Sequence, residues 1–446
     1  MKRLRALFLI AVFMLFSTHA RGASVPTNRE LLDEIRDLKN IIKKQDTRIA
    51  DLEKKVMRRG IEPGAREEKS DKHEEHVFHK EGIKELVEYE GFRLGAGGTF
   101  IFQGTPNANS AGQAENDRID GSYTVDIEIE KSFDDWGLAY ILMEPGQGNG
   151  LDQYLDLFSI VNFDAFDTNS NPLVTEVWYE HYLFDGQLTL TGGKLYAPNY
   201  IDNNEYANDE TTQFISRMFR NADTIEFPGS DWALGGRVNI APKALNCIEL
   251  EGLWMEGDGD WDAVFDHPFI GTQVNFMPAK AFGYDEEMWG GNYRVYFWYN
   301  GTDHVRLKDE EKRKDRNYGF GLSWDQMITD VYGLFGRFGW QEPRVSALEF
   351  HWSLGGQMTG KFWGRPEDIV AVGVGQAIPG KPYGDAGNPN NSETHLETYY
   401  AFKVNEYLTI SPDFQWIWRP DGVGKKNVTE SGDTIFVYGA RGQVGF

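Results

Sequence analysis

The 446-residue sequence contains a single cysteine, Cys247, which excludes an intrachain disulfide, a cysteine-rich metal site and a haem attachment pair. Positive charge is also scarce, with 45 Lys and Arg residues against 69 Asp and Glu residues and a net charge of −24. This balance argues against nucleic acid as a partner. Beyond the N-terminus, no uncharged apolar run approaches the ~20 residues that a membrane-spanning helix needs.

Catalytic motifs are lacking as well. The sequence has no Gly-x-Ser-x-Gly and no His-Glu-x-x-His. Glu249 and Glu251 resemble a glycosidase carboxylate pair, but two neighbours on one strand face are more often wall residues. We therefore predict no enzymatic activity, no catalytic residue, no cofactor and no metal ligand among the site residues. Whether loop 257–269, with its three alternating aspartates, binds Ca²⁺ stays open at this point.

Aromatic residues and glycine are abundant, at 14% aromatics and 49 glycines, while the mean hydropathy is −0.51. A polar average with many aromatics and no membrane helix suits a transmembrane β-barrel, in which lipid-facing and lumen-facing residues alternate. The alternative on composition alone is a soluble all-β protein.

The N-terminal 90 residues divide into three predicted segments. A signal peptide covers 1–22, with Lys2, Arg3 and Arg5 before a ten-residue apolar core. A periplasmic coiled coil covers 27–58, followed by a charged linker over 59–90. The alternative for 27–58 is a surface helix packed on a domain. The heptad positions of the coiled coil are Leu31, Ile35, Leu38, Ile42, Gln45, Ile49, Leu52 and Val56.

From residue 91 to 446 the pattern predicts a 16-stranded antiparallel transmembrane β-barrel. Segments of alternating or β-branched and aromatic residues are separated by turn signals. Short connections such as 185–186 alternate with long ones such as 145–172, as expected when short turns lie on one side of a membrane and long loops on the other. The predicted strands are 92–104, 121–133, 136–144, 173–184, 187–195, 231–241, 244–256, 269–277, 291–300, 316–324, 330–341, 349–361, 367–376, 394–404, 407–418 and 434–446.

Side-chain facing follows from the alternation. In 121–133, Val125 and Ile127 alternate with Asp126 and Glu128. Because a charge facing lipid is destabilising, the carboxylates are predicted to face a water-filled lumen. Acidic strands lie early in the chain and the arginines are spread over later strands, which predicts different sectors of the wall. The predicted pore-lining and constriction residues are Asp126, Glu128, Glu176, Glu180, Asp209, Glu210, Arg237, Glu249, Glu251, Arg294, Trp298, Arg337 and Arg441.

Two further segments carry specific predictions. In the loop 196–230, residues 208–219 are predicted to form a short helix with Asp209 and Glu210 in its first turn. An amphipathic loop of this kind narrows a barrel when it folds inward. The last strand ends on an aromatic residue, Phe446, which resembles the assembly signal of outer-membrane barrels.

The loop carries the most specific motif. NNEYANDETTQF (203–214), which follows GGKLYAPNYID, resembles the signature of the OprB-type carbohydrate-selective porins of Gram-negative outer membranes. Similar stretches are YGFGLSWDQMITDVYGLFGRFGWQ (318–341), SLGGQMTGKFWGRPEDIVAVGVGQ (353–376) and HLETYYAFKVNEYLTISPDFQWIWRPDG (395–422). The resemblance covers residues 190–446 well and 92–190 loosely.

The resemblance implies a sixteen-stranded porin, usually trimeric, that passes sugars and similar small polar solutes by diffusion. Its implied partners are outer-membrane lipid, these solutes, the barrel-assembly machinery and further copies of the chain. The coiled coil departs from the sugar porins, and isolated peptides of its pattern favour two strands rather than three. The alternatives are a barrel anchor whose coiled coil tethers the outer membrane to periplasmic structures, and a general or cation-selective porin without sugar preference.

Overall fold

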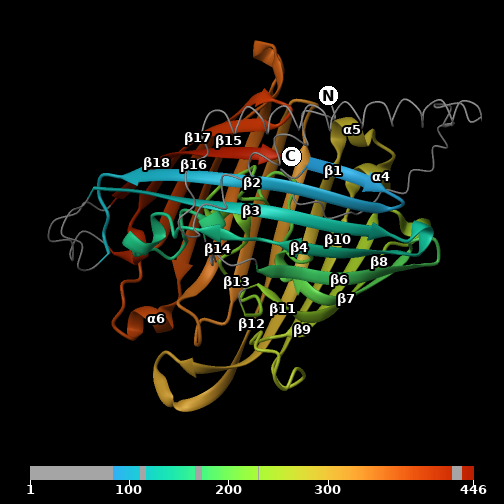
Figure 1. Ribbon diagram of the computed structural model, residues 1–446. Coiled ribbons are helices and arrows are strands. Elements are labelled where there is room, and N and C mark those ends of the chain that lie inside the picture. Colours follow the sequence, from blue (N-terminus) through green and yellow to red (C-terminus); the bar gives the residue numbers. More distant parts are fainter. Residues whose placement is uncertain (1–83, 111–116, 166–172, 230, 424–433, 446) are drawn as a thin grey trace, which may run out of the picture. The chain divides into compact units, whose positions relative to one another are not determined.

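Alternating side chains and regular turns produce a closed antiparallel β-barrel of sixteen wall strands (Figure 1). The computed structural model describes residues 84–110, 117–165, 173–229, 231–423 and 434–445. The wall strands are β2 (Phe92–Thr105), β3 (Arg118–Ser132), β4 (Gly137–Met143), β6 (Val174–Leu183), β7 (Leu188–Tyr196), β8 (Trp232–Ile240), β9 (Ile248–Glu256), β10 (Pro268–Phe276), β11 (Gly291–Arg306), β12 (Asp309–Met327), β13 (Tyr332–Gln341), β14 (Leu348–Gly360), β15 (Arg365–Pro379), β16 (Glu393–Asn405), β17 (Leu408–Trp418) and β18 (Thr434–Gly445).

Closure of the barrel depends on the first and last wall strands. β18 pairs antiparallel with β2, from Gly445 opposite Gly97 to Tyr438 opposite Gly104. Because the ring is complete, each described wall strand pairs with a neighbour on both sides, as a barrel in lipid requires. The prediction of a sixteen-stranded barrel is confirmed, and each of the sixteen predicted segments overlaps one wall strand.

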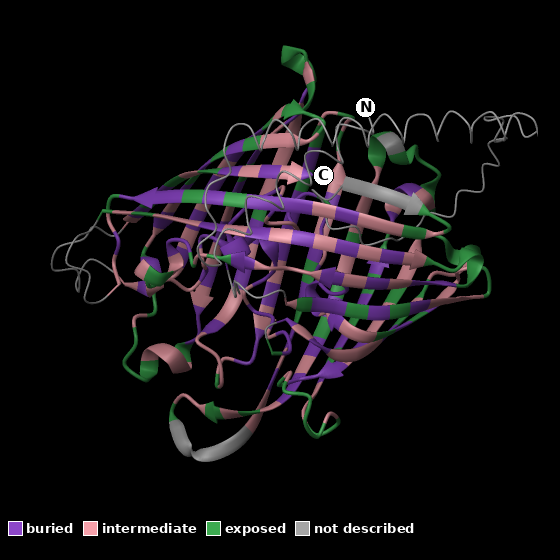
Figure 2. Ribbon diagram, viewed as in Figure 1, coloured by how far each residue is buried: buried purple, intermediate pink, exposed green. Residues whose placement is uncertain are grey.

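The two-residue alternation of the sequence reappears as alternating burial (Figure 2). On β11, Val295 and Phe297 are 56% and 46% exposed, whereas Tyr296 and Trp298 are at most 1% exposed. The apolar side chains that stay exposed form the outer face of the wall, which a bilayer covers. Side chains on the inner face are buried against segments that lie inside the barrel.

Two short strands were not predicted. β1 (Lys84–Tyr89) falls within the expected linker 59–90, and it pairs with β2 from Lys84 opposite Ala96 to Tyr89 opposite Phe92. It therefore continues the edge of β2 beyond the point where β18 ends. β5 (Gly146–Gln147) pairs with β3 in line with β4. Neither strand shows the apolar alternation that identified the others.

The hairpin of β11 and β12 is longer than predicted. Pairing continues past Asn300, as far as Arg306 opposite Asp309. The added residues are mostly charged, so they carry no lipid-facing pattern, and backbone hydrogen bonds alone define them as strands.

The helices are short. Within the described residues, none is long and apolar enough to span a membrane. The α-helices are α3 (Arg217–Arg220), α4 (Pro278–Phe282), α5 (Glu286–Trp289) and α6 (Lys381–Asp385). The single turns of 3-10 helix are η1 (Asp134–Trp136), η2 (Asp152–Tyr154), η3 (Phe163–Ala165), η4 (Ala197–Asn199), η5 (Lys243–Leu245), η6 (Lys361–Trp363) and η7 (Pro420–Gly422). The predicted signal peptide, the coiled coil, most of the linker and Phe446 lie outside the described residues.

Candidate functional site

The connection between β7 and β8, residues 197–231 and hereafter the inner loop, is buried although it contains no strand. Loops normally run over the surface because their backbone polar groups need partners. Here the apolar side chains of the loop are enclosed by the barrel. Those exposed by 1% or less include Ile201, Phe214, Ile215, Met218 and Phe219.

The inner loop packs against the wall formed by β13 to β16. The ring of Phe214 lies 5.4 Å from that of Phe335 on β13 and 5.2 Å from that of Tyr399 on β16, both edge-on. On β15, a Cβ at Gly373 would come within 2.7 Å of the Phe219 ring. Glycine at this position therefore lets the loop lie directly on the strand.

Arg337 on β13 fixes the loop at two points. Its Nη1 donates to the carbonyl oxygen of Phe219 at 2.6 Å, and its Nη2 donates to that of Asp202 at 3.0 Å. Its Nε lies 3.2 Å from the Asp202 carboxylate, and both side chains are fully buried. Burial raises the pKa of Asp202 above its usual range, although Arg337 and the N–H of Ala222 oppose the shift.

Arg441 on β18 holds a second stretch of the same loop. Its Nη1 donates to the carbonyl oxygens of Glu210 at 2.8 Å and Gln213 at 2.6 Å. Its Nη2 donates to the carbonyl oxygen of Thr212 at 2.8 Å. A guanidinium has five donors in a fixed fork, so one side chain can collect several carbonyls. The Arg441 side chain is 1% exposed, so its position is set by these contacts.

Whereas the arginines donate to backbone carbonyls, two carboxylates on β16 accept hydrogen bonds from backbone N–H groups. Glu397 accepts from Ile215 at 2.6 Å and from Ser216 at 3.1 Å. Glu393 accepts from Phe158 at 2.9 Å and from Ser159 at 3.0 Å. The two oxygens of a carboxylate can accept from several donors, so each glutamate holds two consecutive N–H groups. The wall thus satisfies both the donors and the acceptors of the segments it encloses.

A second buried segment, described over residues 144–165 and hereafter the companion loop, lies beside the inner loop. The N–H of Phe163 donates to the carbonyl oxygen of Ile215, and the N–H of Arg217 donates to that of Ile160. Within the companion loop, Asp152 accepts the N–H of Val161 at 2.7 Å. Together the two loops occupy the interior as one hydrogen-bonded unit.

The carboxyl group of Asp152 has an unusually high pKa. Burial raises the pKa of its carboxyl from 3.8 to about 7, although the N–H groups of Val161 and Asn162 act in the opposite direction. The carbonyl oxygen of Val161 accepts from Gln415 on β17 and Gln103 on β2. Asp152 therefore lies at the point where the companion loop is tied to the wall.

A charged cluster lies on the inner face of β6, β8 and β9. Arg237 donates to Glu180 at 2.8 Å and to Glu251 at 2.7 Å. Its guanidinium lies 4.9 Å from the ring centre of Tyr200 in the inner loop. Thr191 also donates to Glu180 at 2.9 Å. The structure thus places this arginine between two of the predicted carboxylates, inside the acidic part of the wall.

The remaining predicted residues of the early strands point inward. Asp126 and Glu128 on β3 are 0% and 3% exposed, respectively. Glu176 accepts from the indole N–H of Trp178 at 3.0 Å. Glu249 accepts from Asn275 at 3.2 Å.

Two predicted wall residues of β11 have different surroundings. Arg294 pairs with Asp325 on β12 at 2.5 Å. Trp298 is fully buried and stacks on Phe269, with ring centres 6.4 Å apart and planes inclined by 14°. Trp298 therefore contributes to the packing of the inner face of the wall.

The helix predicted over 208–219 is wrong in length and position, because only Arg217–Arg220 is helical. Before it, the carboxylate of Asp209 accepts from the hydroxyls of Thr211 and Thr212. Side-chain acceptors of this kind compete with helical backbone hydrogen bonds. Glu210 pairs instead with Arg220 at 2.7 Å.

Several residues that hold the loops escaped sequence reasoning. They include Asp202 and the two glutamates of β16, Glu393 and Glu397. All three residues are fully buried. The signal available was the alternation of Glu393, His395 and Glu397, which places three titratable side chains on one inner face. Nothing in the pattern showed that their partners are backbone groups of the loops.

A sequence model described as "Carbohydrate-selective porin, OprB family" matches residues 120–446. The chain belongs to this family. Porin B of Pseudomonas aeruginosa is 22% identical over 305 residues, which is 56% of this chain and 64% of that protein. An uncharacterized protein of Aquifex aeolicus is 25% identical over 225 residues, or 50% of this chain and 58% of its relative. This chain therefore spans less than two thirds of either relative.

Among solved structures, the high-pH structure of Pseudomonas putida OprB has a TM-score of 0.67 and 16% identity to this chain. The match covers 80% of this chain and 94% of that one. At this identity the likeness shows a shared barrel fold. Family and fold together point to the outer membrane of a Gram-negative bacterium.

Proposed function

We propose that this OprB-family protein is an outer-membrane porin through which carbohydrates or similar small polar solutes diffuse passively. The observation that carries the proposal is the inner loop, which Arg337, Arg441 and Glu397 hold inside a closed barrel. A barrel without such a loop has a lumen as wide as its wall permits. A loop fixed to one side of the wall narrows the passage and gives it a defined polar lining.

The lining suits hydroxyl-rich solutes. The cluster of Glu180, Arg237 and Glu251 combines carboxylate acceptors with guanidinium donors, which are the groups that bind sugar hydroxyls. Asp126, Glu128 and Glu249 extend the polar wall on neighbouring strands. Tyr200 adds an aromatic ring beside the cluster. We assign pore lining to these residues and loop anchoring to Arg337 and Arg441.

Planar-bilayer recording on the purified full chain tests the proposal. We expect steady conductance that falls when oligosaccharides are added, because a bound sugar obstructs ion flow. A barrel that inserts and stays silent would overturn the porin assignment. Conductance that no sugar reduces would leave a porin without sugar preference.

The alternative of a cation-selective porin is favoured by the carboxylates of β3, β6 and β9. The reversal potential in a salt gradient separates it from a sugar porin, because charge selectivity and sugar block are independent readouts. A strong cation preference without sugar block favours the alternative.

The N-terminal segment has a separate proposed role. We assign residues 27–58 to a periplasmic coiled coil that joins copies of the chain, with a trimer favoured by the resemblance to other porins. Deleting residues 24–58 should weaken the oligomer and leave a conducting barrel. Loss of the barrel itself would contradict this modular division. If residues 27–58 instead tether the outer membrane to periplasmic structures, the deletion should separate the membrane from those structures and leave the oligomer intact.

A further inference from the structure

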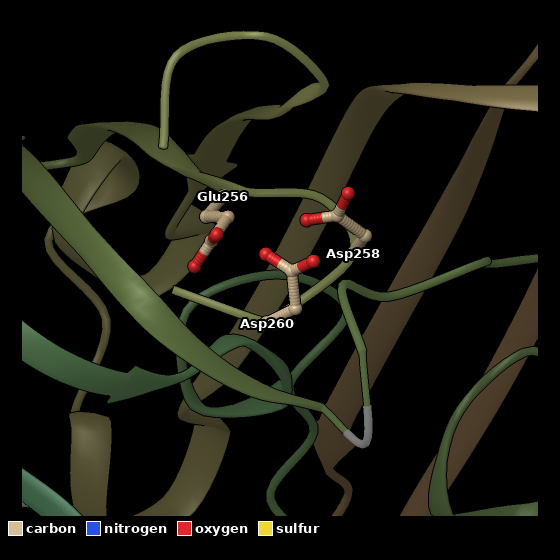
Figure 3. A group of neighbouring side chains, drawn as sticks. All are labelled: Glu256, Asp258 and Asp260. Atoms are coloured by element: carbon tan, nitrogen blue, oxygen red, sulfur yellow. The ribbon is translucent and has the colours of Figure 1, made fainter. Parts of the chain in front are cut away.

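Three carboxylates gather where β9 runs into the loop 257–267. Glu256 is the last residue of β9, and Asp258 and Asp260 follow at alternate positions. One oxygen from each residue lies within 4.8 Å of the corresponding oxygens of the other two. Figure 3 shows the side chains of Asp258 and Asp260 turned toward the same space as Glu256.

Glu256 is the unusual member of this group, because it is 1% exposed. Neither of its carboxylate oxygens has a hydrogen-bonding partner among the described residues, and both are shielded from solvent. The backbone N–H of Trp261 interacts with the carboxylate, but outside hydrogen-bond geometry. Burying a charge without a partner is costly. Two further carboxylates beside it add repulsion rather than compensation.

A cation resolves this conflict. We propose that Glu256, Asp258 and Asp260 bind a divalent metal ion, and that the ion is Ca²⁺ rather than Mg²⁺. Ca²⁺ takes 6–8 oxygen ligands at about 2.3–2.6 Å. Two oxygens on one such ion are therefore at most about 5 Å apart, which the present spacing meets. Three carboxylates supply three to six oxygens, and water completes the shell.

The irregular arrangement favours Ca²⁺ over Mg²⁺. Mg²⁺ demands near-octahedral geometry at about 2.0–2.1 Å and retains several waters, whereas Ca²⁺ accepts bidentate carboxylates and varied angles. The site contains only oxygen donors, which are hard ligands. His267 approaches the group through Asp258, whose Oδ2 lies 3.5 Å from its Nδ1, and so orients that carboxylate.

The site differs from the one that the three aspartates of the loop suggested. Asp262 is not in the group, and its N–H donates to the Oδ1 of Asp260 at 2.8 Å. The loop is also linked to the end of the inner loop, because the N–H of Gly229 donates to the carbonyl oxygen of Gly257 at 3.1 Å. Bound Ca²⁺ would fasten the loop 257–267 to the strand end at this junction.

Calorimetric titration of Ca²⁺ into the chelator-treated full chain tests the proposal directly. We expect one ion per chain with a dissociation constant of about 10⁻⁴–10⁻³ M, the range of extracellular Ca²⁺ modules. Glu256→Gln should weaken binding at least about tenfold, since ligand charge sets affinity. Asp262→Asn is the matched control, because it removes a charge from the same loop outside the group, and it should bind like the parent.

Four outcomes decide the proposal. Absence of binding at millimolar Ca²⁺ overturns it, as does an equal loss in Glu256→Gln and Asp262→Asn, which would indicate diffuse attraction by an acidic loop. Mg²⁺ binding as tight as Ca²⁺ binding overturns the choice of ion. If Glu256→Gln fails to fold, as judged by loss of the heat-dependent shift in gel mobility, Asp258→Asn and Asp260→Asn decide instead. Both aspartates are exposed, and parent-like binding by both variants overturns the site.

Discussion

Arg337 on β13 and Asp202 in the inner loop form a fully buried ion pair in which the arginine also donates to the carbonyl oxygen of its partner. The two residues are far apart in sequence and belong to the wall and to the segment it encloses. The same division recurs at Arg441 and at Glu397, whose partners are backbone groups of the loop. Much of the charge inside this barrel therefore serves to position the loop.

Replacing Arg337 by methionine should loosen the inner loop. Breaking a buried ion pair from one side costs about 3–5 kcal/mol, of which protonation of Asp202 recovers a part. We expect higher and noisier single-channel conductance from a barrel that still assembles. Arg344→Met is the control, because Arg344 pairs with Glu342 in the connection between β13 and β14 and its side chain is 50% exposed. Equal changes in both variants would contradict the anchoring role.

Arg441→Met should release the stretch 210–213 of the inner loop. Each hydrogen bond to a charged group contributes about 1.5–3 kcal/mol, and Arg441 donates to three carbonyls of this stretch. Arg441→Lys keeps the charge but loses the fork, so its conductance noise should be intermediate. Noise equal to that of the parent in Arg441→Met would mean that the loop is held without this residue.

Phe446→Ala should act on assembly and leave the conductance of correctly folded barrels unchanged. The terminal aromatic resembles an assembly signal, whereas Arg441 lies on the inner face five positions earlier. The yield of heat-modifiable barrel in isolated outer membranes measures the effect. If Phe446→Ala and Arg441→Met both reduced only this yield, the role given to Arg441 would be wrong.

Arg237→Gln should make the pore more cation-selective. The substitution leaves Glu180 and Glu251 without the guanidinium that now lies between them. Carboxylates facing a water-filled passage concentrate cations. The reversal potential in a salt gradient should shift toward the cation equilibrium value, and the Arg237→Lys variant should lie near the parent.

Rising pH should loosen the companion loop. Asp152 has a pKa of about 7 in place and 3.8 when released, so between these values only the docked loop holds the proton. Docking is therefore strongest below pH ~4, weakens as pH rises to 7 and changes little above it. The hydrogen-exchange protection of residues 150–163, corrected for the intrinsic pH dependence of amide exchange, should fall across this window. In Asp152→Asn, the protection of residues 150–163 should no longer depend on pH. If the pH dependence persisted in this variant, another titrating group would be its cause.

The sequence predicts the wall better than its contents. Lipid on one side and water on the other impose a two-residue alternation, which is clear in wall strands such as β3 and β10. β1 lacks this pattern, because its sequence, KELVEY, does not alternate between apolar and polar residues. The inward position of Arg337 and Arg441 followed from the same alternation. Their partners did not, because a guanidinium that binds carbonyls of a segment more than a hundred residues away leaves no local pattern.

The edge of β2 is shared by both ends of the barrel chain, with Gly445 opposite Gly97 and Lys84 opposite Ala96. This edge of β2 is therefore hydrogen-bonded along its full length only when both β1 and β18 are in place. Without either segment, part of this edge of β2 would lack a partner strand. Two segments that are more than 340 residues apart in the sequence thus share one edge of a single strand.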